Sequence, residues 1–120
     1  MLISRRALCA GLFGMAHHEP TLTAYLPITR PGIASWYGPR FHGRLTASGA
    51  RYNMNALTAA SPWIKLGSVV KIYYRDRLVV VTINDRMPTS SRRDFDLSKA
   101  AAQRLGILDI GVAQIKWSYQ

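Results

Sequence analysis

Carboxylates are the side chains of this sequence best suited to acid–base chemistry, and there are only six of them. Asp85 follows an apolar run at 78–83 that predicts a buried strand, so it should emerge at the rim of a sheet. Asp96 precedes a helix-start signal at Ser98. A carboxyl group can donate a proton and later accept one if its surroundings raise its pKa. Simpler roles stay open: Asp85 can pair with Arg86 or shape a turn, and Asp96 can interact with a helix N-terminus.

The amino-acid composition excludes some kinds of site and limits the size of the fold. Cys9 is the single cysteine, which excludes an intramolecular disulfide and a Cys-rich zinc site. We expect neither a metal nor another cofactor. The 120 residues, 48% of them hydrophobic, predict one compact domain with a real core. A formal net charge of +10 favours an anionic partner, which can be nucleic acid, an acidic membrane surface or an anionic polymer.

The first sixteen residues differ in composition from the rest. Residues 1–6 carry two arginines and no acid, residues 7–16 are apolar, and Gly14 and Ala16 suit a cleavage site. This layout predicts a signal peptide over 1–16, with a disordered basic tail as the alternative. The apolar run is too short to span a bilayer, and the residues before Cys9 make a poor lipidation site. We therefore expect an exported protein of the periplasm or cell wall, without a stable membrane span or lipid anchor.

The elements that must position the carboxylates are short. Residues 17–31 contain three prolines and predict an extended linker, followed by a domain over 32–119. Apolar and β-branched runs predict strands at 33–37, 69–74, 78–83 and 110–119. Residues 75–77 predict a hairpin turn. Ser98 as N-cap and Gly106 as C-terminal stop frame a helix over 99–105. The pattern predicts a mainly β fold, a small closed barrel with one short helix.

Six short motifs occur in a fixed order between and within these elements. They are GIASWYG at 32–38, FHGR at 41–44, TASG at 46–49, LTAA at 57–60, INDR at 83–86 and DLS at 96–98. Together they resemble the RlpA family, the rare lipoprotein A group of septal peptidoglycan lytic transglycosylases. The resemblance covers nearly all of 32–119 and implies a six-stranded double-psi β-barrel, a fold shared with expansins.

The resemblance also implies a reaction and a set of residues that perform it. A lytic transglycosylase cleaves the β-1,4 bond between MurNAc and GlcNAc without water, and one carboxyl group serves as acid and then as base to leave a 1,6-anhydro end. Asp85 is the first candidate for that group, and Asp96 is its competitor. The side chains expected to bind substrate are Trp36, Tyr37, His42, Arg44, Thr46, Ser48 and Arg86.

The sequence departs from the family at two positions that matter for proton transfer. The family usually has Glu after the TASG motif and His after LTAA, and this chain has Ala50 and Ser61 there. Alanine carries no proton, and a serine hydroxyl is far too weak an acid to replace imidazole. Met87 replaces the glycine that usually follows the INDR motif.

Three functions remain open at this point. The first is an exported transglycosylase, weakened in its cleft, that acts on peptidoglycan glycan strands as a monomer, with septal division proteins as further partners. The second is a catalytically inactive wall-binding or expansin-like module. The third, a nucleic-acid-binding barrel, rests on charge alone, lacks a recognised motif and conflicts with the export signal, so we expect no nucleic-acid partner.

Overall fold

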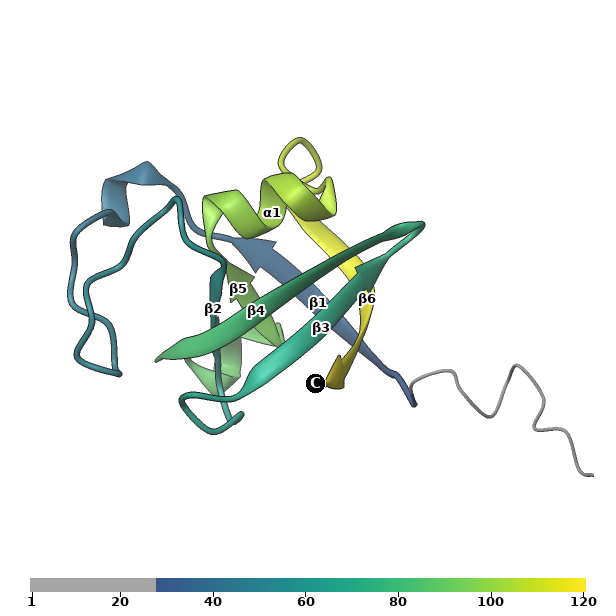
Figure 1. The fold of residues 1–120 in the computed structure, drawn as a ribbon, viewed down its shortest axis with the longest axis horizontal. Coiled ribbons are helices and arrows are strands. Elements are labelled where there is room, and N and C mark those ends of the chain that lie inside the picture. Colours follow the sequence, from purple (N-terminus) through teal and green to yellow (C-terminus); the bar gives the residue numbers. More distant parts are fainter. Residues whose placement is uncertain (1–27) are drawn as a thin grey trace, which may run out of the picture.

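The computed structural model describes residues 28–120, so the expected signal peptide and most of the linker lie outside the described residues. Six strands close into a barrel in the order β1-β5-β2-β4-β3-β6 (Figure 1). The elements are β1 (Arg30–Trp36), β2 (Thr58–Ser61), β3 (Val69–Tyr74), β4 (Arg77–Arg86), β5 (Phe95–Leu97), α1 (Lys99–Leu105) and β6 (Val112–Tyr119), with 3-10 turns at Pro39–Phe41 and Thr89–Ser91. The expected six-stranded β-barrel with one helix is confirmed.

Two of the pairings are parallel and the rest are antiparallel. β1 runs parallel to β5, and β2 runs parallel to β4, whereas β5 and β2 are antiparallel neighbours. The short β2 and β5 therefore form the middle of one barrel wall, between the longer β1 and β4. Thr58–Ser61 and Phe95–Leu97 were not among the strands expected from the sequence, because short runs with small or charged residues carry little strand signal of their own.

The core is built from the inward-facing side chains of the long strands. Val81 and Ile83 on β4 are buried, as the apolar run predicts, and they pack with Phe95 and Trp117. The expectation that 78–83 is buried on both faces is wrong at Leu78, which is 45% exposed, because the outer face of this part of β4 is open to solvent.

Several element boundaries differ from expectation by one to three residues. β1 begins at Arg30, within the segment expected to be linker. β6 begins at Val112 rather than at residue 110. The hairpin turn contains only Arg75 and Asp76, because Arg77 already pairs with Tyr74, and Arg75 adopts a left-handed backbone with φ of 55°.

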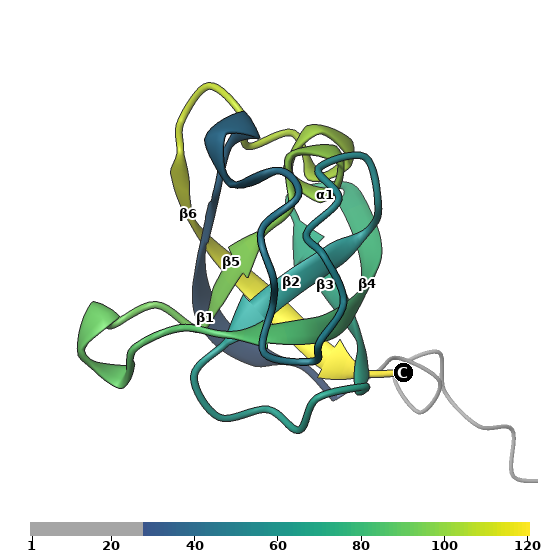
Figure 2. The same ribbon diagram turned by 90° about the vertical axis from the view of Figure 1, so that its left-hand side faces the viewer.

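The helix has the boundaries that its capping residues predict. The Ser98 hydroxyl accepts a hydrogen bond from Ala101 N, and Gly106 ends the helix with a left-handed φ of 85°. The same hydroxyl donates to Ala56 O at 2.6 Å, so Ser98 also attaches the helix to the segment before β2. Figure 2 shows α1 at one end of the barrel and the long segment between β1 and β2 alongside the wall. Within residues 28–120, no helix has the length and apolar character needed to cross a membrane.

Removing the Ser98 hydroxyl should destabilise the fold. We expect Ser98→Ala to cost about 1–3 kcal/mol, because the helix loses its N-cap and the partly buried Ala56 carbonyl loses a donor. Urea unfolding followed by circular dichroism measures this cost. Ser118→Ala is the matched control: the Ser118 hydroxyl is buried without a partner among the described residues, so its removal should be neutral or stabilising. Equal costs for the two variants would contradict the capping role.

Candidate active site

A cleft of about 380 Å³ lies between the β5-β2-β4 wall and the segment that joins β1 to β2. Both candidate carboxylates line it, Asp85 from the end of β4 and Asp96 from β5. The full lining is Tyr37, Phe41, Arg44, Leu45, Thr46, Tyr52, Ala60, Asp85, Arg86, Met87, Pro88 and Asp96.

One row of paired residues across four strands sets the geometry of this cleft. Ser35 on β1 pairs with Asp96, Asp96 pairs with Ala60 on β2, and Ala60 pairs with Asp85. Side chains of directly paired residues lie on the same face of a sheet. Strands are spaced about 4.8 Å apart, so the Cα atoms of Asp85 and Asp96 lie roughly 10 Å apart. The methyl group of Ala60 stands between the two carboxylates.

A β-bulge in β4 brings Asp85 into this row. Ala59 pairs with Ile83, yet the next residue, Ala60, pairs with Asp85, so Asn84 is the extra residue of the bulge. Strand side chains alternate between the two faces, and a regular ladder would place Asn84 opposite Ala60 and turn Asp85 toward the core. Because of the bulge, Ile83 points into the core and Asp85 points into the cleft, although the two residues are only two positions apart.

The environment of Asp96 favours its protonated form. Burial raises the pKa of the Asp96 carboxyl above its usual range, and the charge of Asp85 adds to this. The hydrogen bond from Ser35 Oγ to Asp96 Oδ1, at 2.9 Å, and the charge of Arg93 lower it by smaller amounts. Arg93 Nη1 in turn donates to Ser35 Oγ at 3.0 Å, which fixes the direction of the serine hydroxyl.

Asp85 has a different environment, made of backbone donors. Its Oδ1 accepts hydrogen bonds from Ala47 N at 2.9 Å and from Arg86 N at 2.8 Å. A third bond, from Ser48 N to Asn84 O, joins the same loop to the bulge. The Arg86 guanidinium donates to the carbonyl oxygens of Ser61 and Ile64. Asp85 therefore holds the 46–50 loop against the barrel wall.

Three aromatic side chains form the apolar part of the cleft. The ring of Tyr37 lies 4.3 Å from that of Tyr52 and 5.9 Å from that of Phe41, centroid to centroid. Burial, then the charge of Asp85, raises the pKa of Tyr37 far above its usual range, with smaller contributions from Tyr52 and Asp96. The Tyr37 hydroxyl is buried without a partner among residues 28–120. It is therefore a neutral hydroxyl whose hydrogen-bonding capacity is unused among these residues.

Tyr52 connects the cleft to the helix and was not identified from the sequence. Its hydroxyl donates to Tyr37 O at 3.1 Å and accepts from Lys99 N, the first residue of α1, at 3.2 Å. Burial, together with Asp96, raises the pKa of Tyr52 despite the bond from Lys99. A lone tyrosine in a polar loop carries no sequence signal for this role.

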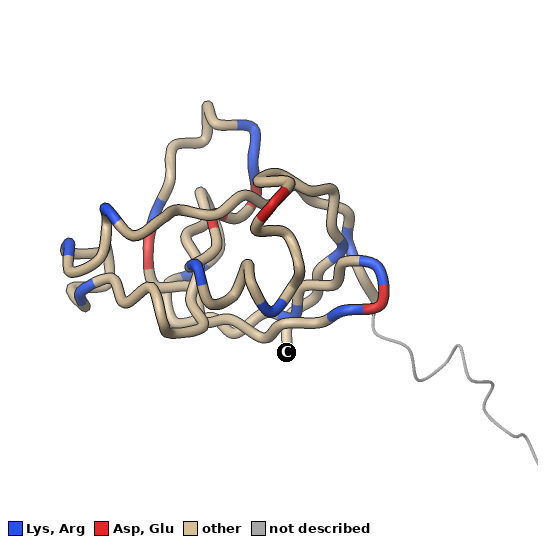
Figure 3. The backbone as a smooth tube through the Cα atoms, turned by 90° about the horizontal axis from the view of Figure 1, so that it is seen from above, with Lys and Arg blue, Asp and Glu red and all other residues tan. Residues whose placement is uncertain are grey.

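The structure brings some of the expected substrate-binding residues together and not others. Tyr37, Arg44, Thr46 and Arg86 line the cleft beside the two aspartates. Ser48 lies next to it, with its hydroxyl 2.9 Å from Thr46 Oγ1. Figure 3 shows that basic residues are distributed around the whole molecule rather than gathered at one rim.

Trp36 and His42 lie outside the cleft lining, contrary to expectation. Ser35 lies beneath the cleft on the same face as Asp96, so the alternation of β1 turns Trp36 the other way, where it packs against the core and donates from Nε1 to Leu108 O at 3.3 Å. His42 is exposed, and its Nδ1 accepts from Met54 N at 3.2 Å, as in a turn-stabilising role.

The two positions that depart from the expected pattern have ordinary structural roles here. Ser61 is fully buried, and its hydroxyl accepts hydrogen bonds from Ile64 N at 3.3 Å and Trp63 N at 3.5 Å. Ala50 is exposed, and its carbonyl accepts from both Thr46 N and Thr46 Oγ1. Neither position supplies a group that moves a proton.

Comparison with known proteins identifies the family. A family model described as a lytic transglycolase matches residues 29–117. The endolytic peptidoglycan transglycosylase RlpA of Neisseria meningitidis is 48% identical over 90 residues, which is 73% of this chain and 38% of that protein. The chain belongs to the RlpA family. The RlpA of Campylobacter jejuni is 42% identical over 101 residues, covering 82% of this chain and 36% of the relative. The chain thus spans well under half the length of these two RlpA proteins.

Solved structures share the RlpA-family barrel. A Streptomyces papain inhibitor superposes with a TM-score of 0.64 and 26% identity, covering 77% of this chain and 94% of the inhibitor. An expansin of Clavibacter michiganensis gives a TM-score of 0.63 at 18% identity, over 78% of this chain and 50% of the expansin. The expansin likeness concerns the fold alone.

The raised pKa of Asp96 in this RlpA-family cleft predicts how stability changes with pH. A carboxyl with a raised pKa in the folded state stabilises the fold below the unfolded pKa of about 3.9, and this contribution is lost as pH rises through the folded pKa. Asp96→Asn does not ionise and keeps an acceptor for Ser35. We therefore expect the variant to gain thermal stability relative to the wild type between pH 4 and pH 7. Calorimetry at both pH values measures the Tm of the variant and of the wild type. A difference in Tm that becomes smaller from pH 4 to pH 7 would contradict this prediction.

Proposed function

We propose that this domain is an endolytic peptidoglycan transglycosylase in which Asp96 is the acid and base. The proposal rests on one observation above all: Asp96 lines the cleft with a carboxyl whose pKa is raised by burial. The relatives' printed names supply the substrate class, since both RlpA proteins are called peptidoglycan transglycosylases.

The reaction needs one carboxyl group and no water. Protonated Asp96 donates its proton to the glycosidic oxygen while the bond from that oxygen to the MurNAc anomeric carbon breaks. The MurNAc 6-hydroxyl then bonds to the anomeric carbon, and its proton passes to the Asp96 carboxylate. The acid is thereby regenerated, and the products are a 1,6-anhydro end and a free 4-hydroxyl. The hydroxyl is held within the same sugar, which supplies much of the rate.

Other residues of the cleft position the substrate and the acid. Ser35 orients the Asp96 carboxyl through its hydrogen bond to Oδ1. Asp85 raises the proton affinity of Asp96 by its charge and keeps the 46–50 loop in place. The ring of Tyr37 packs against the sugar in the apolar part of the cleft, and Arg44 attracts the lactyl or peptide carboxylates of the wall polymer.

Digestion of purified sacculi tests the assignment of the acid. We expect the wild type to release 1,6-anhydro products and Asp96→Asn to release roughly 10²–10⁴-fold less, the usual contribution of a positioned acid–base group. Asp85→Asn keeps an oxygen acceptor for Ala47 N and removes only a charge, so we expect it to reduce the release of 1,6-anhydro products less than Asp96→Asn does. Mass spectrometry of the soluble products measures both. A larger loss for Asp85→Asn than for Asp96→Asn would make Asp85 the acid.

Ala50 and Ser61 favour a second candidate, a wall-binding module without turnover. In that case the cleft holds the glycan strand through its tyrosines and arginines, and neither aspartate transfers a proton. Retention on sacculi without soluble products from the wild type would support this candidate.

Restoring the family's residues separates a weakened enzyme from a binding module. If the domain is a weakened enzyme, the double variant Ala50→Glu and Ser61→His should raise anhydro-product release roughly 10²–10⁴-fold. Either change alone should give less, because groups that act as a unit are not additive. The same mass analysis measures the gain, with circular dichroism as the check that the buried Ser61 site tolerates histidine. A folded, glycan-binding double variant without product would establish the binding module.

The site of action follows from the substrate. The protein acts outside the cytoplasm, where peptidoglycan lies, and residues 1–16 serve as its signal peptide. We propose that it works as a monomer near septal division proteins.

A further inference from the structure

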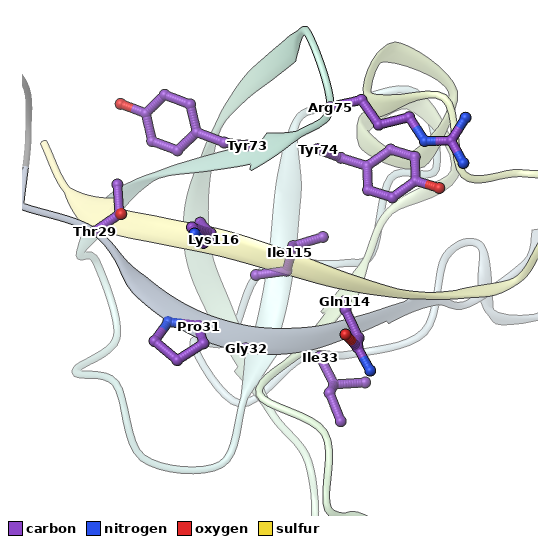
Figure 4. A pocket seen from close by; sticks show the side chains of 10 residues that line it. All are labelled: Thr29, Pro31, Gly32, Ile33, Tyr73, Tyr74, Arg75, Gln114, Ile115 and Lys116. Carbon is purple, nitrogen blue, oxygen red and sulfur yellow. The ribbon is translucent and has the colours of Figure 1, made fainter.

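A second cavity, of about 690 Å³, lies on the outer face of β1, β6 and β3 (Figure 4). We name it the trough. One row of paired side chains crosses it, Pro31 on β1, Lys116 on β6 and Tyr73 on β3, and a second pair, Ile33 and Gln114, lies beside this row. Arg75, in the turn between β3 and β4, also lines the trough.

The trough has the chemistry of a binding surface for an anionic saccharide. Tyr73 offers an aromatic face that can stack on a sugar ring, and Gln114 offers hydrogen bonds. Lys116 and Arg75 are exposed cations, and the described lining contains no carboxylate. The nearby carboxylate of Asp94 accepts a hydrogen bond from Ile33 N at 2.8 Å, on the edge of β1. Charge complementarity therefore favours an anionic ligand over a neutral one.

The trough and the cleft lie on opposite sides of the barrel. The cleft is built on β5, β2 and β4, whereas the trough is built on β1, β6 and β3. In the closed order, β6 lies three strands from β2 in either direction, which is directly across a six-stranded barrel. A polysaccharide chain bound in the cleft therefore leaves the trough free to bind a second polysaccharide chain.

We propose that the trough binds a second, peptide-free peptidoglycan glycan strand through its free lactyl carboxylates, while the cleft holds the glycan strand to be cut. The identity of the polymer rests on the proposed function. Lys116 and Arg75 pair with the carboxylates, and Tyr73 stacks on the sugar between them. The domain is thereby held to the wall by a strand that it does not cleave.

Amide NMR titration of the full chain tests this proposal. The probe is a peptide-free GlcNAc–MurNAc tetrasaccharide with free lactyl groups, and (GlcNAc)₄ is the control of equal length without carboxylates. We expect the tetrasaccharide to shift the amide signals of residues 73–75 and 114–116 in the wild type and in Asp96→Asn alike, less so as salt is raised. (GlcNAc)₄ should shift them only weakly. These amide shifts report binding and do not require cleavage. The titration therefore tests the trough even if the domain proves to have no transglycosylase activity.

Matched variants assign the binding to the trough. The double variant Tyr73→Ala and Lys116→Ala should weaken tetrasaccharide binding at these signals about tenfold and leave the signals of the cleft unchanged. Tyr73→Phe keeps the ring and should bind as the wild type does. Lys65→Ala removes an exposed lysine outside both cavities and is the control for charge alone.

Four results would overturn the proposal. They are shifts confined to the cleft, equal affinity for (GlcNAc)₄, tighter binding of a single-stranded DNA oligonucleotide, and shifts of the trough signals that follow protein concentration without ligand. The last result would identify the trough as a contact between two copies of the chain.

Discussion

The bulge at Asn84 is the constraint on which the candidate site depends. β4 must fill the barrel interior with Val79, Val81 and Ile83 and also present Asp85 to solvent at its end. A regular strand cannot do both two residues apart, because its alternation would keep Asp85 on the inner face. The extra residue changes the register against β2, and the parallel pairing of β2 with β4 then aligns Ala60 with Asp85.

The two aspartates show how similar positions in a sheet acquire different properties. Both lie in the same row across the wall, one strand to either side of Ala60. Asp85 accepts two solvent-exposed hydrogen bonds from backbone amides, whereas Asp96 accepts one hydroxyl and is more deeply enclosed. The neighbouring loop reaches Asp85 and not Asp96. Local donors and burial, rather than strand geometry, therefore distinguish them.

The sequence predicted those features whose signals are local. Ser98 and Gly106 gave the helix its two ends, and the β-branched runs predicted β3, β4 and most of β6. β2 and β5 escaped prediction because their pairing partners, rather than their own residues, make them strands. For the same reason the face on which Trp36 lies, the role of Tyr52 and the bulge itself could not be predicted. Each depends on contacts between residues far apart in the chain.

The attachment of the segment between β1 and β2 has a consequence for how such a domain can diversify. Asp85 accepts a hydrogen bond from Ala47 N of this segment. Farther along the segment, the Tyr52 hydroxyl donates to Tyr37 O and accepts from Lys99 N at the start of α1. Leu45 and Arg51 form an isolated bridge that closes the loop held by Asp85, and the side chains of Arg40 and Arg44, which precede this loop, are exposed. These exposed positions can therefore change while the loop at Ala47 and the wall that carries Asp96 stay as they are. Selectivity for different polymers can evolve in one part of the chain without disturbing the part that holds the proton.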